Sequence, residues 1–358
     1  MRARALFGVP LLLLTMHLAA CAPRLQPLGP MAATTTATKA AAATTAGERL
    51  SMTAPAPAAD QLMMDDGVAL PLRHWPAKGP AKAVILALHG FNDYSRAFEM
   101  PAAIWARKGI ETYAYDQRGF GATDHRGVWP GEARLIEDAD SAIAQIRARD
   151  PGLPLFLLGE SMGGAVAMCA MAGQQPLPVD GVILVAPAAW AREDLGPVAN
   201  GLLWVMAHSL PWYTLTGEGL HIVPSDNQSM LAELFFDPLV IKGTRTDAVY
   251  GLVQLMDDAY TAAPRLKGRI FVAYGVHEQV VDEDVAADML RRLPRGPGAP
   301  RIAIYPDGYH MLMRDLNGGI VSRDIAAWIL DPTAPLPSAA DARGRRFLAA
   351  SGGLSTAR

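Results

Sequence analysis

Residues 153–172, "LPLFLLGESMGGAVAMCAMA", contain a sharp transition between two kinds of secondary structure. The first half is an apolar run typical of a buried strand, and the second half predicts a helix of small residues. The joint between them, "GESMGG" (159–164), places one serine, Ser161, among three glycines. This pattern has two interpretations: a tight connection that tolerates only small residues, or a strained turn that presents Ser161 as a nucleophile.

Five further apolar runs have the same character as the strand in this stretch, and helix-length segments such as 134–148 lie between most of them. Strands that are apolar on both faces and alternate with helices predict an α/β fold with a mostly parallel, doubly wound sheet. In such sheets ligands bind beyond the carboxyl ends of the strands, so the residues that follow each run are the candidate site. The runs are "AVILALHG" (83–90), "ETYAYD" (111–116), "GVILVAP" (181–187), "RIFVAYG" (269–275) and "RIAIYP" (301–306).

The interval from about 188 to 260 breaks this alternation. It contains no clear strand pattern and combines Trp, Leu and Met residues with Pro and Gly breaks. Because it is longer than a crossover connection needs, we expect a helical cap over the strand ends, with a pair of ordinary crossover helices as the alternative. Its apolar residues would suit an acyl chain or pack within the cap itself; they include Trp204, Leu210, Trp212 and Leu220.

The residues that follow three of the runs supply a nucleophile, an acid and a base. Ser161, Glu278 and His310 occur in the chain order Ser, acid, His, each just after a predicted strand. His310 would take the proton from Ser161, and Glu278 would orient the imidazole and stabilise its charge. Asp282 and Asp284 lie nearby and are alternatives for the acid. His89, after the first run, is the alternative for the base.

The turn after the first run predicts an oxyanion hole. In acyl transfer, one backbone donor follows the nucleophile, here Met162, and the second comes from a loop that faces it. The glycine in His89-Gly90-Phe91 would let the backbone N–H of Phe91 approach. His89 itself lies early in the chain within this turn, and we expect it to have a structural role.

Several motifs resemble the α/β-hydrolase superfamily: the elbow "GESMGGA", the early "LHGFNDYS" and "YDQRGFGATD". Within it the chain is most similar to the monoglyceride lipase, lysophospholipase and serine-aminopeptidase-like branch, as "DPLVIKGTRTDAVYGLVQLMDDA" and "GYHMLMRD" also indicate. The likeness covers roughly residues 66–331. It implies the same assignment of roles: the triad Ser161, Glu278 and His310 with the oxyanion amides of Phe91 and Met162.

The chain departs from this family pattern at the acid. The family's usual Gly-x-x-Asp is here "GVHE" (275–278), so Glu278 stands where an aspartate is expected. A glutamate also accepts a hydrogen bond from an imidazole N–H, but its extra methylene must be accommodated. His277 has no role that we can assign, and we expect it to face solvent.

The resemblance implies a serine hydrolase of small lipid carboxylic esters, such as monoacylglycerols or lysophospholipids, that works through an acyl-enzyme. A serine hydrolase of another class, namely a peptidase, thioesterase or acyltransferase, would keep the same residues and is the alternative. A third hypothesis is a non-catalytic lipid-binding lipoprotein. The presence of serine, acid and histidine together disfavours it.

The amino-terminal segment has the pattern of a bacterial lipoprotein signal. Residues 1–20 begin with a short positive region followed by an apolar run, and "LAAC" (18–21) resembles a lipobox. The pattern predicts cleavage before Cys21, lipidation of Cys21 and a flexible Ala/Thr/Pro tether over residues 21–60. An ordinary signal peptide, or a cytosolic protein with an apolar start, is the alternative.

These signals predict the domain organisation and the location of the protein. The hydrolase domain would span residues 61–331, and the Pro-, Ser- and Gly-rich residues 332–358 predict a flexible tail. A lipid at Cys21 would anchor the protein in the bacterial cell envelope. Ala22 follows Cys21 in place of the aspartate that often retains lipoproteins in the inner membrane, which favours the outer membrane, facing the periplasm.

Composition excludes several other functions. The 32 Lys and Arg residues against 35 Asp and Glu residues give a formal net charge of -3, without the basic face expected of a nucleic-acid-binding protein. The scattered histidines form no HExxH motif and the two cysteines no CxxC motif, so we expect neither a metal nor another cofactor. Cys169 lies in the apolar segment after Ser161 and is expected to be a small buried hydrophobe.

Overall fold

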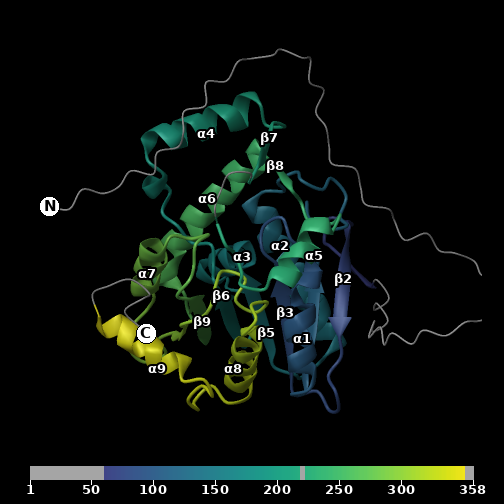
Figure 1. Ribbon diagram of the computed structural model, residues 1–358. Coiled ribbons are helices and arrows are strands. Elements are labelled where there is room, and N and C mark those ends of the chain that lie inside the picture. Colours follow the sequence, from purple (N-terminus) through teal and green to yellow (C-terminus); the bar gives the residue numbers. More distant parts are fainter. Residues whose placement is uncertain (1–59, 218–221, 351–358) are drawn as a thin grey trace, which may run out of the picture.

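The computed structural model describes residues 60–217 and 222–350 (Figure 1). The predicted signal, the predicted lipidation site Cys21 and nearly all of the predicted tether lie outside the described residues, as does Leu220. Within the described residues, no helix combines the length and the apolar character needed to cross a bilayer.

The core of the fold is an eight-stranded sheet with the order β1-β2-β4-β3-β5-β6-β9-β10. All six predicted strands are present, and they form its parallel part, from β4 to β10. The predicted α/β fold with a mostly parallel, doubly wound sheet is therefore confirmed. The strands are β1 (Asp60–Met63), β2 (Ala69–Trp75), β3 (Ala83–Leu88), β4 (Ile110–Tyr115), β5 (Leu155–Glu160), β6 (Gly181–Val185), β9 (Ile270–Gly275) and β10 (Arg301–Tyr305).

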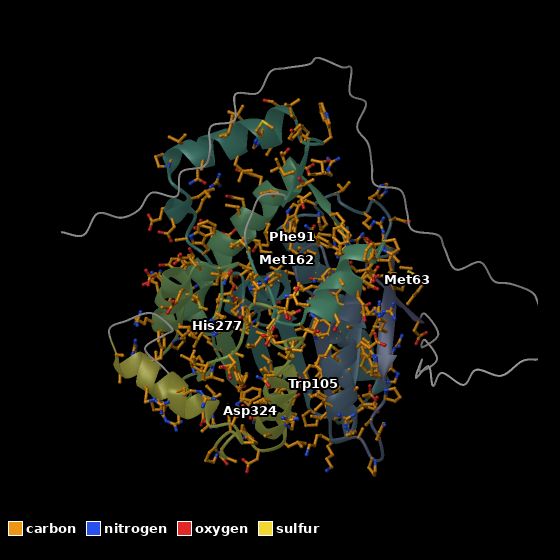
Figure 2. All side chains as sticks on the ribbon, in the orientation of Figure 1. Met63, Phe91, Trp105, Met162, His277 and Asp324 are labelled. Carbon is orange, nitrogen blue, oxygen red and sulfur yellow. The ribbon has the colours of Figure 1, made fainter. Side chains whose placement is uncertain are left out.

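Alternate residues of each central strand enter two separate apolar layers, one on each face of the sheet. On one face the layer contains residues of α2 (Glu132–Arg149), α3 (Met162–Ala172) and α7 (Glu283–Arg292). On the other face it contains residues of α1 (Glu99–Ala106) and α8 (Gly318–Leu330). These two helices are also joined by a hydrogen bond, since the indole N–H of the buried Trp105 donates to the Ser322 carbonyl at 2.9 Å (Trp105 is labelled in Figure 2).

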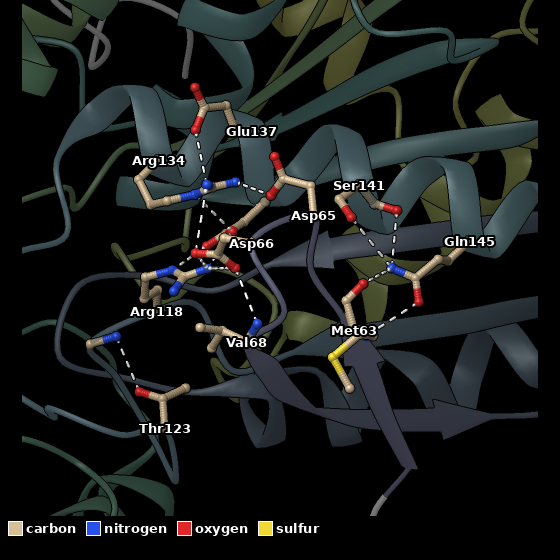
Figure 3. A network of polar contacts seen from close by, with 12 residues as sticks. Met63, Asp65, Asp66, Val68, Arg118, Thr123, Arg134, Glu137, Ser141 and Gln145 are labelled. Atoms are coloured by element: carbon tan, nitrogen blue, oxygen red, sulfur yellow. Dashed lines mark hydrogen bonds and ion pairs between the residues drawn. The ribbon is translucent and has the colours of Figure 1, made fainter.

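The antiparallel hairpin of β1 and β2 was not predicted, and charged residues attach it to the body of the domain (Figure 3). Asp138 of α2 is fully buried and pairs with Arg118 at 2.9 Å and with Arg134 at 3.1 Å. Asp66, in the turn of the hairpin, pairs with the same Arg118 at 3.0 Å. The hairpin, the loop after β4 and helix α2 are thereby held together by one ionic network.

The interval 188–260, for which we expected a cap, folds into helices and one short antiparallel ribbon on the side of the sheet where the parallel strands end (Figure 1). Helix α6 packs against α3, and α4 packs on α6. Trp204 and Leu210 are about half exposed, at 51% and 41%, so they do not lie in the interior of the cap. The elements are η2 (Arg192–Leu195), α4 (Pro197–Ser209), β7 (Thr214–Thr216), α5 (Gln228–Phe236), β8 (Gly243–Arg245) and α6 (Thr246–Ala262).

The expectation of a flexible tail from residue 332 was wrong for the segment that forms α9 (Ala340–Ala349). This helix packs against β10, and its Phe347 side chain is fully buried. At Gly344 an added Cβ would lie 2.1 Å from the carbonyl oxygen of Ile302, so only glycine permits this close approach. The Pro, Ser and Gly content of the segment suggested disorder, but Ala340, Gly344 and Phe347 provide a buried packing face.

Candidate active site

Ser161 occupies the turn between β5 and α3 in a strained conformation. Its backbone has φ 52° and ψ −115°, and a positive φ is costly for a residue with a side chain. Three hydrogen bonds hold the turn: the Ser161 N–H donates to the Val185 carbonyl at 3.0 Å, and the Ser161 carbonyl accepts from the N–H groups of Ala165 at 3.1 Å and Ala188 at 3.0 Å. The structure therefore agrees with the strained-turn interpretation of the "GESMGG" sequence.

The glycines of this turn are required by close backbone contacts. A Cβ at Gly159 would lie 2.3 Å from the carbonyl oxygen of Gly163. A Cβ at Gly163 would lie 2.1 Å from the carbonyl oxygen of Leu88 in β3. Neither contact is possible for another residue without moving the backbone, so the first interpretation, a connection that tolerates only small residues, also holds.

The structure brings the predicted nucleophile, base and acid together from the ends of β5, β10 and β9. His310 Nε2 lies 3.0 Å from Ser161 Oγ, and His310 Nδ1 lies 2.8 Å from Glu278 Oε2. An ionised carboxylate only accepts hydrogen bonds, so Nδ1 carries the proton and Nε2 accepts from the serine hydroxyl. This is the geometry in which a histidine acts as general base toward a serine.

Glu278 is held in place as an ion. Its Oε1 accepts from the N–H groups of Val280 at 2.8 Å and Val281 at 3.1 Å, while Oε2 faces His310. Burial opposes its ionisation, but the charge and hydrogen bond of His310 and the two backbone donors outweigh burial and hold the pKa of Glu278 below its usual value. The structure thus accommodates the extra methylene of the glutamate. The alternative acids are not in this position, since Asp282 caps α7 by accepting from the Asp284 N–H at 2.9 Å.

The pKa of His310 is shifted in the opposite direction from that of Glu278. Burial lowers the pKa of its imidazole, but the negative charge and hydrogen bond of Glu278 outweigh burial, and the pKa of His310 lies above its usual value. The loop that carries His310 is also joined to the acid loop, since the His277 N–H donates to the Gly308 carbonyl at 2.9 Å. The His277 ring is half-buried and stacks on Tyr309, with ring centroids 5.0 Å apart, so only part of it faces solvent (His277 is labelled in Figure 2).

The two predicted oxyanion donors flank the serine. Met162 is the first residue of α3, where the backbone N–H groups of the first turn have no partner within the helix. Phe91 follows Gly90 in the turn after β3, and a Cβ at Gly90 would lie 3.4 Å from the Cβ of Ser161, so this turn touches the nucleophile. In the view of Figure 2, the labelled residues Phe91 and Met162 both lie below helix α4 of the cap.

His89 supports the oxyanion turn and is not placed as a base. The Gln117 backbone N–H donates to its Nε2 at 2.9 Å, so Nδ1 carries the proton and donates to the Gly90 carbonyl at 2.8 Å. The side chain is completely buried, and burial lowers the pKa of its imidazole. The expected structural role of His89 is confirmed.

The cap is attached to both the oxyanion turn and the histidine loop. Asn92 has a positive φ of 64°; its carbonyl accepts from the Ile241 N–H at 2.9 Å, and its amide donates to Thr244 Oγ1 at 2.7 Å. On the other side, Asp315 accepts from the Ser225 hydroxyl at 2.6 Å and from the Tyr309 N–H at 2.8 Å. The cap therefore contacts the loops that present the candidate donors and base.

Three charged residues at the site were not identified from the sequence. Arg314, Asp93 and Glu160 form a buried ionic cluster directly behind the serine, as described below. The available signal was position: each lies within four residues of a predicted site residue. Among the described residues, no group of His, Cys, Asp and Glu side chains is arranged to hold a metal ion.

The sheet order, the strained serine turn after β5 and the acid and histidine after β9 and β10 define an α/β-hydrolase. A family model described as serine aminopeptidase, S33, matches residues 79–317, about two thirds of the chain, and the chain belongs to this family.

Monoglyceride and monoacylglycerol lipases are similar to this chain over most of their own length. Monoglyceride lipase of Rattus norvegicus is 25% identical over 276 residues, which cover 75% of this chain and 89% of the relative. Monoacylglycerol lipase of Mycolicibacterium smegmatis is 23% identical over 269 residues, which cover 74% of this chain and 94% of the relative. The solved structure of Paleococcus ferrophilus monoacylglycerol lipase has a TM-score of 0.63 at 19% identity and covers 73% of this chain and 98% of that chain. The protein is an enzyme, a carboxylic ester hydrolase.

Proposed function

We propose that the protein is a serine hydrolase of lipid carboxylic esters, of the monoacylglycerol lipase or lysophospholipase type. The observation that carries this proposal is the continuous hydrogen-bonded chain from Glu278 through His310 to Ser161, at the carboxyl edge of an α/β-hydrolase sheet. The monoglyceride and monoacylglycerol lipases among its relatives support the choice of substrate class.

The geometry supports a two-step reaction. His310 Nε2 takes the hydroxyl proton of Ser161 as Oγ attacks the ester carbonyl carbon, and the backbone N–H groups of Phe91 and Met162 stabilise the resulting oxyanion. The tetrahedral intermediate collapses when the C–O bond to the alcohol breaks and the alcohol takes the proton from His310. Glu278 stabilises the transient imidazolium.

Hydrolysis of the acyl-enzyme repeats these steps with water. His310 removes a proton from the water as its oxygen attacks the acyl carbon, and the same two amides hold the second oxyanion. The Ser161 oxygen then leaves and recovers its proton from His310, and the fatty acid is released. No cofactor is needed for either step.

The surface of the cap supports a lipid substrate. Helix α4 contains no Asp, Glu, Lys or Arg residue. It exposes large apolar side chains, and an exposed apolar patch of this kind is typical of a surface that contacts lipid or another partner. These side chains are Val198, Leu202, Trp204 and Val205.

The proposed activity is tested with an active-site probe and a series of esters. A fluorophosphonate should label the wild type and the control variant Ser209→Ala, which changes an exposed serine of α4, but not Ser161→Ala. The wild type should release p-nitrophenol from long-chain as well as short-chain esters, and fatty acid from monoacylglycerols or lysophospholipids. Equal labelling of Ser161→Ala would contradict the nucleophile, and activity on short esters alone would contradict the lipid substrate.

Peptidase activity in addition to ester hydrolysis is the second candidate, because the matching family model is described as a serine aminopeptidase. The same nucleophile, base and oxyanion donors would act on an amide carbonyl. Aminoacyl p-nitroanilides distinguish the two functions, since a lipid esterase should leave them intact at enzyme concentrations that consume monoacylglycerol completely.

We also propose that the protein is a lipoprotein of the bacterial cell envelope, anchored through Cys21 in the outer membrane and facing the periplasm. The amino-terminal pattern supports this proposal, and residues 21–60 provide a tether of suitable composition. Metabolic labelling with a fatty acid should mark the full-length chain but not Cys21→Ala. Cys169→Ala is the matched control and should be labelled like the wild type; an unlabelled wild type would contradict the anchor.

A further inference from the structure

A buried ionic cluster lies behind the candidate active site. The guanidinium of Arg314 pairs with Asp93 Oδ2 at 2.7 Å and with Glu160 Oε2 at 3.1 Å. All three residues are buried, with 5%, 5% and 2% of Arg314, Asp93 and Glu160 exposed. None of the three was assigned a role in the reaction above.

The cluster connects the three segments that present the reacting groups. Glu160 immediately precedes Ser161, Asp93 follows Phe91 by two residues, and Arg314 follows His310 by four. A single side chain therefore touches the nucleophile turn, the oxyanion turn and the histidine loop.

Three buried charges are an inefficient way to stabilise a fold. Removing charges from water carries a large desolvation penalty, and buried ion pairs are often no better for stability than well-packed apolar residues of the same volume. Glu160 shows the cost: Oε1 is buried without a hydrogen-bond partner among the described residues, and burial raises the pKa of its carboxyl. A planar guanidinium, by contrast, holds two carboxylates in a fixed relative position, which a flexible ammonium does not.

We propose that Arg314 is a positioning residue of the hydrolytic site, whose guanidinium fixes the Ser161 turn, the Phe91 turn and the His310 loop relative to one another through Glu160 and Asp93. This inference rests on the proposed function, because it assigns the cluster to the same reaction. Arg314 touches neither the substrate nor the reacting atoms in this assignment. Its loss should change how well the transition state is stabilised and leave substrate binding nearly unchanged.

The test compares Arg314→Met and Arg314→Lys with the wild type on a water-soluble p-nitrophenyl ester. Each preparation is titrated with fluorophosphonate, so that kcat refers to folded, reactive sites only. We expect kcat to fall roughly 100-fold in Arg314→Met and about tenfold in Arg314→Lys, with KM within about twofold of the wild type. Arg295→Lys, which changes an exposed arginine, is the control and should match the wild type.

A second variant guards against misfolding and separates positioning from charge neutralisation. The triple variant Asp93→Asn, Glu160→Gln and Arg314→Met carries no buried charge in the cluster, so it should fold even if Arg314→Met does not. If the guanidinium positions the three segments, kcat per titrated site stays low in the triple variant. If Arg314 only neutralises the two carboxylates, kcat returns to the wild-type value and the proposal is overturned.

Results that would overturn the positioning role differ from results that would overturn the proposed function. A wild-type kcat per titrated site in Arg314→Lys and Arg314→Met, or a loss confined to KM, would overturn the positioning role. Such a result would leave the proposed function intact as long as Ser161→Ala is inactive. Failure of the proposed function would be recognised separately, because the wild type itself would then lack hydrolysis and fluorophosphonate labelling.

Discussion

At the scale of single residues, the site depends on a few side chains whose protonation and position are set by their neighbours. Ser161 is held at φ 52° by a turn that only glycines permit on either side. Glu278 replaces the aspartate expected from the family pattern. Its Oε1, the oxygen that does not face His310, accepts hydrogen bonds from two backbone N–H groups. The hydrogen bond from His310 to this carboxylate determines which imidazole nitrogen faces the serine.

The proposed role of Glu278 as the acid gives a mutational prediction. Glu278→Gln should lower kcat by about a thousandfold or more, because the amide can favour the wrong tautomer of His310 and no longer stabilises the imidazolium. Glu278→Asp should lose less activity, since it keeps the charge but shortens the reach to His310 by one methylene. Steady-state kinetics on a p-nitrophenyl ester measures both effects.

The matched control for these variants is Asp284→Asn, which removes an exposed carboxylate in the first turn of α7. It should retain wild-type kcat. A larger loss in Asp284→Asn than in Glu278→Gln would show that the acid is assigned to the wrong residue.

The shifted pKa of His310 predicts the pH dependence of the reaction. Three charged groups face this imidazole: Glu278 from the acid loop and Glu160 from the end of β5 raise its pKa, and Arg314 from its own loop lowers it. The base must be neutral, so kcat/KM should fall as the pH decreases through a pKa above the usual histidine value. In Glu278→Gln the raising charge is lost, and the acidic limb of the residual activity should move to lower pH. A limb that stays in place or moves to higher pH would contradict this account.

At the scale of secondary-structure elements, the C-terminal helix α9 is part of the folded domain. It covers the edge strand β10, with Phe347 buried and Gly344 against the strand backbone. The helix thereby covers the otherwise unpaired edge of the sheet. This edge is also the one next to the histidine loop.

The packing of α9 predicts a stability effect without an effect on the chemistry. Phe347→Ala should lower the free energy of unfolding by about 3–5 kcal/mol, the usual cost of removing a buried aromatic side chain. Arg345→Lys, on the exposed side of the same helix, keeps the positive charge beside Asp341 and should change it by less than about 0.5 kcal/mol. Thermal or denaturant unfolding measures the difference, and equal stabilities of the two variants would show that α9 is not docked.

At the scale of the whole molecule, the cap carries an exposed apolar surface, and the candidate reacting groups follow strands of the sheet. Helix α4 lies on the outside of the cap, and the site lies beneath the cap at the carboxyl ends of the strands (Figures 1 and 2). The cap is attached to the oxyanion turn through Asn92 and to the histidine loop through Asp315. A protein that takes substrate from a lipid phase would present this side of the molecule to it.

This arrangement predicts that hydrolysis of esters in a lipid phase and hydrolysis of dissolved esters respond differently to changes in α4. The double variant Leu202→Ser and Val205→Ser should reduce kcat/KM several-fold for long-chain esters in micelles or vesicles, because less apolar surface can be buried on contact. It should leave hydrolysis of a dissolved short-chain ester unchanged. Leu330→Ser, an exposed apolar residue at the end of α8, is the control and should affect neither substrate. A parallel loss on both substrates would indicate damage to the fold or the site.

Much of the fold and the candidate site could be predicted from the sequence because the signals are local. Six buried strands are continuous apolar runs, and the strained turn at Ser161 is recognisable from its neighbouring glycines. Glu278 and His310 follow strands of the same parallel sheet, and the parallel arrangement alone brings their strand ends to one edge. The β1–β2 hairpin was missed because β2 is half-buried and combines Pro71, Arg73 and His74 with its apolar positions.

By itself, the amino-acid sequence determined the parallel sheet, the serine turn, Ser161 and His310 as candidate reacting residues, and a short set of candidate acids, because these follow from local patterns and from strand direction. Only the tertiary structure decided which carboxylate meets His310, that α9 packs on β10, and that Arg314 joins Asp93 and Glu160. Arg314 and Glu160 are 154 residues apart in the chain. No local pattern encodes such a contact, because it exists only where strands far apart in sequence have already placed their loops side by side.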